Sequence, residues 1–159
     1  MEKFKSINPY TNQLIEEFDT HTTAEIEAYI DAADNAYKKW RQTSFEHRTE
    51  LMYKAAAVLR AGKEKYAKAM VLEMGKPIKE AYAEIEKCAW VCEYYANGAK
   101  EFLKDEIIET DADKSLVQYD PIGAVLAIMP WNFPYWQVFR FAAPALMAGN
   151  VCLLKHAQN

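Results

Sequence analysis

The sequence predicts an α/β fold in which a helical amino-terminal part precedes a strand–helix–strand unit. Apolar residues recur every three or four positions through most of residues 22–103, as on the buried face of an amphipathic helix. Two apolar runs, 124–129 and 151–154, then flank a further helical pattern at 134–147. Because continuous apolar runs are typical of strands covered on both faces, we expect the two runs to pair in a parallel, doubly wound sheet.

Before the first helix, residues 4–18 are expected to form an extended arm with a turn at 8–12. Thr22 and Glu25 have the spacing of a capping box, so a helix should begin there. Its predicted apolar face consists of Ile26, Tyr29, Ile30, Ala33, Tyr37 and Trp40.

Local signals divide the rest of the helical part. Ser44 is expected to cap a second helix, and Gly62 marks an interruption in it. Gly75 can end the continuation, and Pro77 can occupy the first turn of the next helix. The predicted inward residues before Gly75 are Leu51, Ala55, Val58, Leu59, Tyr66, Ala69 and Met70. Those of the long helix that follows are Ile78, Ala81, Ile85, Cys88, Cys92, Tyr95, Ala99 and Phe102.

The three cysteines are interpreted as reduced, buried residues. Cys88 and Cys92 share a helix face and have apolar neighbours, and without two further ligands they do not form a zinc site. Cys152 lies in an apolar run, so we interpret it as a buried strand residue and not as a nucleophile. We expect no metal site.

After Lys104 the pattern changes to strands. Ile107–Ile108 and Leu116–Tyr119 are predicted to pair across the polar turn 111–113. Pro134 should start a helix that ends before Gly149. The expected organisation is therefore a helical part at 1–103, a hairpin at 104–121 and a βαβ unit at 122–159.

Composition excludes some classes of function. A formal net charge of −4 without a basic stripe argues against nucleic acid. The uncharged run after Asp120 is long enough to reach across a bilayer, but Pro121, Pro130 and Pro134 break it, so no membrane span is expected. The start, MEKFKSINPY, lacks the apolar segment of a secretory signal, and we expect a cytoplasmic protein.

The candidate functional centre is Met129-Pro130-Trp131-Asn132-Phe133-Pro134. It places one carboxamide between bulky apolar residues and two prolines. A dry, rigid corner of this kind can aim a hydrogen-bond donor at a developing oxyanion. The alternative is a turn in which Asn132 bonds its own backbone.

The stretch from Tyr119 to His156 resembles the NAD(P)-dependent aldehyde dehydrogenases in its PWNFP block, its AGN turn and its strand ending in Lys155. INPYTNQLI, MGKP and CAWVCEYYA fit the same family, so the resemblance covers essentially the whole chain; it is strongest to the bacterial succinate-semialdehyde dehydrogenase type. It implies a Rossmann-like cofactor-binding domain whose sheet is incomplete here. It also implies a hairpin that pairs across the interface of a homo-oligomer, a dimer or tetramer.

The resemblance assigns a role to each site residue. Asn132 would donate from its side-chain nitrogen to the oxyanion of a thiohemiacetal. Lys155 would bond the adenosine ribose, the alternative being a solvated lysine at a strand end. Gln158 stands where the family usually has a glutamate; a neutral amide would not repel a 2′-phosphate, so the cofactor is expected to be NAD or NADP. The positions expected at the nicotinamide end are Met129, Pro130 and Trp131.

Spacing adds a candidate for substrate binding. Asn132, Trp136 and Arg140 are four residues apart, so Trp136 and Arg140 share a helix stripe that is directed from the Asn132 corner. Arg140 is isolated in an apolar region, and a guanidinium binds a carboxylate in a fork. The resemblance agrees, since semialdehyde dehydrogenases that act on short acids have an arginine on this helix. The alternative is a structural ion pair with a carboxylate elsewhere.

The expected activity is NAD(P)-dependent oxidation of an aldehyde to an acid, with succinate semialdehyde as the expected substrate. The family's nucleophilic cysteine, general-base glutamate and second glycine-rich loop have no counterpart in these 159 residues. We therefore expect that the catalytic domain is absent and that this chain alone is inactive. The alternative is a truncated, non-catalytic fragment with only a folding or association role.

Overall fold

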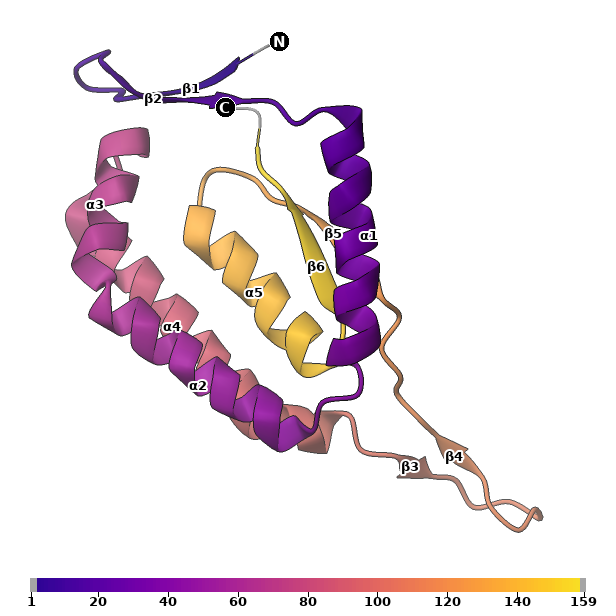
Figure 1. Cartoon of the computed structure of the whole chain (residues 1–159). Coiled ribbons are helices and arrows are strands. Elements are labelled where there is room, and N and C mark those ends of the chain that lie inside the picture. Colours follow the sequence, from indigo (N-terminus) through magenta and orange to yellow (C-terminus); the bar gives the residue numbers. More distant parts are fainter. Residues whose placement is uncertain (1–2, 158–159) are drawn as a thin grey trace.

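The computed structural model describes residues 3–157 and confirms a mixed α/β fold (Figure 1). Its elements are β1 (Lys3–Ile7), β2 (Leu14–Asp19), α1 (Thr23–Trp40), α2 (Phe45–Ala61), α3 (Lys63–Met74), α4 (Ile78–Phe102), β3 (Glu106–Ile107), β4 (Leu116–Val117), β5 (Ala124–Ile128), α5 (Pro134–Met147) and β6 (Val151–Lys155). The pairs β1–β2 and β3–β4 are antiparallel, and β5–β6 is parallel. The predicted βαβ unit is therefore present, as β5, α5 and β6.

Helix boundaries follow the local signals in the sequence. The backbone N–H of Thr22 donates to the Glu25 carboxylate at 2.7 Å, and the Thr22 hydroxyl accepts the Glu25 N–H, which completes the capping box. Ser44 accepts the N–H of His47 at the start of α2. Gly62 separates α2 from α3, and Gly75 ends α3 with a left-handed φ of 68°. These boundaries were predictable because caps act within one helical turn.

Helix α4 is the centre of the core and packs against α2, α3 and α5. Its innermost residues are small or of medium size, which lets the helices approach closely. They include Ala81, Ile85, Cys88 and Cys92, each at most 1% exposed. The predicted stripe is confirmed through the middle of α4. It is wrong at its two ends, where Ile78 and Phe102 are 45% and 52% exposed.

Two other predicted apolar faces need correction. In α2 the buried positions are Arg48, Met52, Ala56 and Leu59, so the predicted inward Val58 points outward and is 58% exposed. In α1 the first half of the predicted face, from Ile26 to Ile30, is about half exposed. The reason is that α1 is attached through its second half. There Tyr37 donates to the carbonyl of Pro121 and Trp40 donates to that of Leu146.

Strand β5 is not covered on both faces by the described residues. Leu126 and Ile128 are 61% and 67% exposed, whereas Ala127 is buried. Within residues 3–157, β5 pairs only with β6, and α1 packs against both strands. The apolar run thus identified the strand correctly, but its predicted surroundings are incomplete here.

Buried Arg48 of α2 joins the carboxyl ends of α1 and α5. Its guanidinium donates to the carbonyl oxygens of Met147, Trp40 and Arg41 at 3.0, 3.2 and 3.1 Å. Burial lowers the pKa of this group, but an arginine stays charged at neutral pH. Gly149 follows α5 with a φ of 92°, and a Cβ there would lie 3.1 Å from Arg48 Nη1. The guanidinium therefore needs a glycine beside it.

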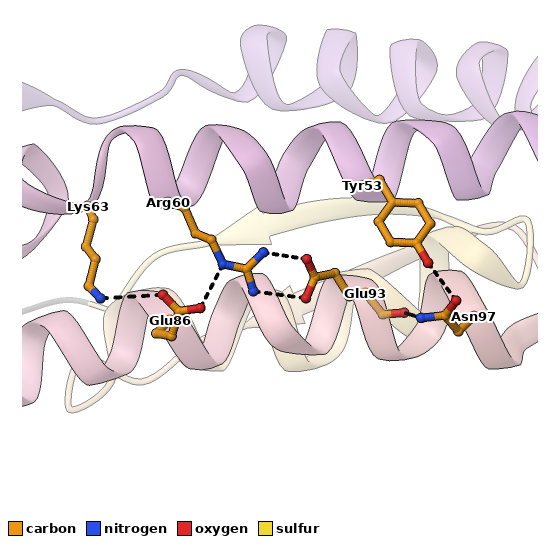
Figure 2. A network of polar contacts seen from close by, with 6 residues as sticks. All are labelled: Tyr53, Arg60, Lys63, Glu86, Glu93 and Asn97. Atoms are coloured by element: carbon orange, nitrogen blue, oxygen red, sulfur yellow. Dashed lines mark hydrogen bonds and ion pairs between the residues drawn. The ribbon is translucent and has the colours of Figure 1, made fainter.

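An exposed polar network joins α2 and α3 to α4 (Figure 2). Arg60 donates to Glu86 at 2.7 Å and binds both carboxylate oxygens of Glu93. Lys63 also reaches Glu86, at 3.4 Å. Because these groups are exposed and screened by solvent, we expect the network to add little to stability.

Candidate functional site

The turn between β5 and α5 carries the predicted centre. Pro134 begins α5 and has no N–H to donate, and Phe133 at the N-cap provides no side-chain hydrogen bond. The next two amides are bound by a residue from another helix. Glu84 of α4 accepts the N–H of Tyr135 at 2.9 Å and that of Trp136 at 3.0 Å, both through Oε1. Glu84 is 4% exposed, so this cap lies inside the protein.

The other carboxylate oxygen of Glu84 accepts from the ammonium of Lys76, which is also buried. The Lys76 nitrogen lies 4.0 Å from the ring centroid of Phe133, within the range of a cation–π contact. One buried ion pair therefore contacts the turn through a ring and through two amides.

A groove of about 560 Å³ lies beside this turn, between α4 and α5. It brings three of the predicted residues together: Asn132, Trp136 and Arg140. The described structure contains no hydrogen bond from the Asn132 side chain to its own backbone. Asn132 is exposed and lies at the groove, so its carboxamide is available to a ligand.

Two cations at the groove are not in ion pairs with any residue in 3–157. Arg140 is exposed and forms no salt bridge there, so the alternative of a structural ion pair is not realised in this part of the chain. Lys87 of α4 places its ammonium 4.0 Å from the ring centroid of Trp136. Glu80 supplies one negative charge at the same groove. Outside the Lys76–Glu84 pair, the groove therefore favours an anionic ligand.

The residues predicted at the nicotinamide end do not line the groove with Arg140; they follow β5 at the carboxyl edge of the β5–β6 pair. The N–H of Met129 donates to the carbonyl of Lys155 at 3.2 Å, which joins the two strand ends. Pro130 and Trp131 follow and are exposed, as is Lys155. Open α/β sheets bind ligands at this edge. Gln158 lies outside the described residues.

None of the three cysteines has the properties of a nucleophile. Burial raises the pKa of Cys88 to about 12 and that of Cys92 to about 11, and it also raises the pKa of Cys152. All three are free thiols that remain protonated at neutral pH. Residues 3–157 contain no cluster of metal-ligating side chains, and no helix among them is long and apolar enough to span a membrane.

Comparison with known proteins now settles the family. The model of the aldehyde dehydrogenase family matches residues 1–159. This chain belongs to the aldehyde dehydrogenase family. A probable succinate-semialdehyde dehydrogenase (NADP+) from Synechocystis sp. is 51% identical over 154 residues, covering 97% of this chain and 34% of the relative. Succinate-semialdehyde dehydrogenase (NADP+) 1 from Mycobacterium tuberculosis is 45% identical over 157 residues, with the same two coverages.

Solved structures of the family have the same fold. Succinic semialdehyde dehydrogenase from Streptococcus pyogenes, in complex with NADP+, superposes with a TM-score of 0.93 at 38% identity. The match covers 98% of this chain and 34% of that one. The chain thus spans about a third of the length of the aldehyde dehydrogenases that it matches.

Sequence reasoning missed three residues at this candidate site: Lys76, Glu84 and Lys87. A signal for Glu84 was available, because it stands between Ala81 and Cys88 on the most buried stripe of α4. A carboxylate at such a position requires a partner for its charge. The identity of that partner was not predictable from periodicity, because the amides that it binds are 51 and 52 residues away.

Proposed function

We propose that this chain is the amino-terminal, cofactor-binding part of an enzyme that oxidises succinate semialdehyde to succinate with NAD+ or NADP+. One observation supports the proposal most strongly: Asn132 and Arg140 line a single groove. A carboxamide suits the aldehyde end of this substrate, and a guanidinium suits its carboxylate end. The relatives named as NADP+-dependent succinate-semialdehyde dehydrogenases support the same assignment.

In the proposed reaction, a cysteine thiolate adds to the aldehyde carbon and negative charge develops on the former carbonyl oxygen. The side-chain N–H of Asn132 would donate to that oxygen. Loss of one such donor typically costs about a hundred- to a thousand-fold in rate. The raised pKa values of Cys88, Cys92 and Cys152 argue that the thiolate comes from polypeptide outside these residues.

The carboxyl edge of the β5–β6 pair carries side chains that could bind a dinucleotide. Lys155 offers a cationic donor there, and exposed Trp131 offers an apolar surface close to Asn132 in the chain. NAD+ or NADP+ bound at this edge would accept the hydride from the substrate. Met129, Pro130 and Trp131 would limit access of water to that transfer.

We also propose a role in assembly for the hairpin, residues 104–121. Its strands β3 and β4 are two residues each, and Ile107 is 72% exposed. In Figure 1 the hairpin extends away from the helices. Such a short pair is marginal alone, so a second subunit of the complete enzyme, in a dimer or tetramer, is its proposed partner. A cytoplasmic location remains a prediction from the sequence.

The test of function uses a chimeric enzyme in which this chain replaces the corresponding third of the Synechocystis relative. We expect it to reduce NAD+ or NADP+ with succinate semialdehyde. A folded, cofactor-binding chimera that turns over no aldehyde would overturn the proposal. Turnover by the 159-residue chain alone would overturn the inference that the thiolate comes from elsewhere.

A further inference from the structure

We infer that Glu84 is a positioning residue for this reaction: it fixes the amino end of α5 and thereby orients Asn132. The inference rests on the proposed function. Asn132 itself has no side-chain hydrogen bond in the described structure, so the backbone on either side of it sets where its Cα–Cβ bond points.

The backbone after Asn132 is held by Glu84. Pro134 cannot donate, and the N–H of Gln137 already donates to the carbonyl of Phe133 at 2.9 Å. The amides of Tyr135 and Trp136 both donate to Glu84 Oε1. A carboxylate at the start of a helix also interacts favourably with the helix dipole. One side chain therefore satisfies both donors and fixes where α5 begins.

The same ion pair restrains the residue next to Asn132. Lys76 pairs with Glu84 and lies against the ring of Phe133, 4.0 Å from its centroid. Before Asn132, the Met129 amide is bound to the end of β6. Glu84 thus makes two of these restraints directly, through the amides of Tyr135 and Trp136. It supports a third by holding Lys76 against the ring of Phe133. Loss of its charge should let the turn move while the rest of the fold remains.

A double-mutant cycle in the chimeric enzyme separates positioning from a purely structural role. Glu84→Gln keeps the size of the side chain but weakens its bonds to the amides and to Lys76. Because small misplacements in a reacting geometry cost one to two orders of magnitude, we expect kcat to fall about tenfold or more with little change in KM. In the Asn132→Ala background the same substitution should change kcat less than about twofold.

Glu93→Gln is the matched control. Glu93 lies on the same helix and also binds a cation through both oxygens, but it belongs to the exposed network in Figure 2 and does not line the groove. We expect its kcat to be unchanged. Should Glu84→Gln fail to fold, Glu84→Asp takes its place in the cycle: it keeps the charge for Lys76, but it is too short to hold both amides.

The kinetic results distinguish failure of this inference from failure of the proposed function. If Glu84 variants lower kcat by the same factor with and without Asn132, or do not lower it at all, the inference is overturned while the proposed function stands. If Asn132→Ala itself leaves kcat unchanged, the oxyanion role fails, and the proposed function fails with it.

Discussion

Glu84 and Arg48 bind opposite ends of helix α5. Glu84 accepts two amide hydrogens at the amino end, and Arg48 donates to the carbonyl of Met147 at the carboxyl end. Both side chains are about 95% buried, and each charge is opposite to the partial charge of the helix end that it touches. The helix that begins at the candidate site is thus held by two charges from α4 and α2.

Arg48→Met should be strongly destabilising. It removes the donor for three carbonyl groups, one of which is in a fully buried hydrogen bond. We expect the free energy of unfolding to fall by about 3 kcal/mol or more. Urea denaturation measures this free energy. Arg60→Met is the exposed control, and we expect it to lose about 1 kcal/mol or less. Equal losses in the two variants would contradict the role assigned to Arg48.

Arg140→Ala should change substrate preference without changing stability. Arg140 is exposed and has no salt bridge within residues 3–157, so the fold does not depend on it. In the chimeric enzyme we expect kcat/KM for succinate semialdehyde to fall by about thirtyfold or more, because a charged hydrogen bond contributes about 2 kcal/mol. Butanal, which lacks the carboxylate, should be oxidised as before. Equal losses on both aldehydes would count against a carboxylate clamp.

Gln158→Glu should move the cofactor preference toward NAD+. The prediction comes from the sequence, since Gln158 lies outside the described residues. A carboxylate near a 2′-phosphate places like charges together, and we expect affinity for NADP+ to fall about tenfold or more relative to NAD+. Titration of both cofactors into the wild-type and variant chimeras measures the ratio. An unchanged ratio would show that residue 158 does not face the adenosine ribose.

The buried thiols should make stability sensitive to alkaline pH. Burial raises the pKa of Cys88 from 9.0 to about 12 and that of Cys92 to about 11. The folded chain therefore holds these protons more tightly than the unfolded chain does. The contribution to stability is full below pH 9, and it is lost progressively as the pH rises from 9 through 11 and 12. Denaturation of Cys88→Ala from pH 7 to 11 should show a weaker decline than wild type, and identical slopes would contradict this.

The elements that sequence reasoning located correctly depend on local signals. Thr22, Ser44, Gly62 and Gly75 act on residues within one turn, so helix boundaries could be read directly. The alignment of Trp136 with Arg140 on one groove was likewise predictable, because both lie on α5 and helical spacing is a local property.

The errors involve contacts between distant segments. Val58 was predicted inward because apolar spacing alone cannot decide between two adjacent faces of α2. Packing against α4 selects the face that contains Met52 and Ala56. Glu84 was missed for the same reason: its function depends on amides brought to it by the tertiary fold.

The two-stranded β5–β6 sheet has a consequence for handling the polypeptide. Leu126 and Ile128 are exposed apolar side chains on a two-stranded sheet that has an unpaired edge among the described residues. Such an edge can pair with the same strand of a second molecule, and the exposed apolar side chains can pack together. During purification of the isolated chain, concentration and ionic strength will therefore govern whether it stays monodisperse or precipitates.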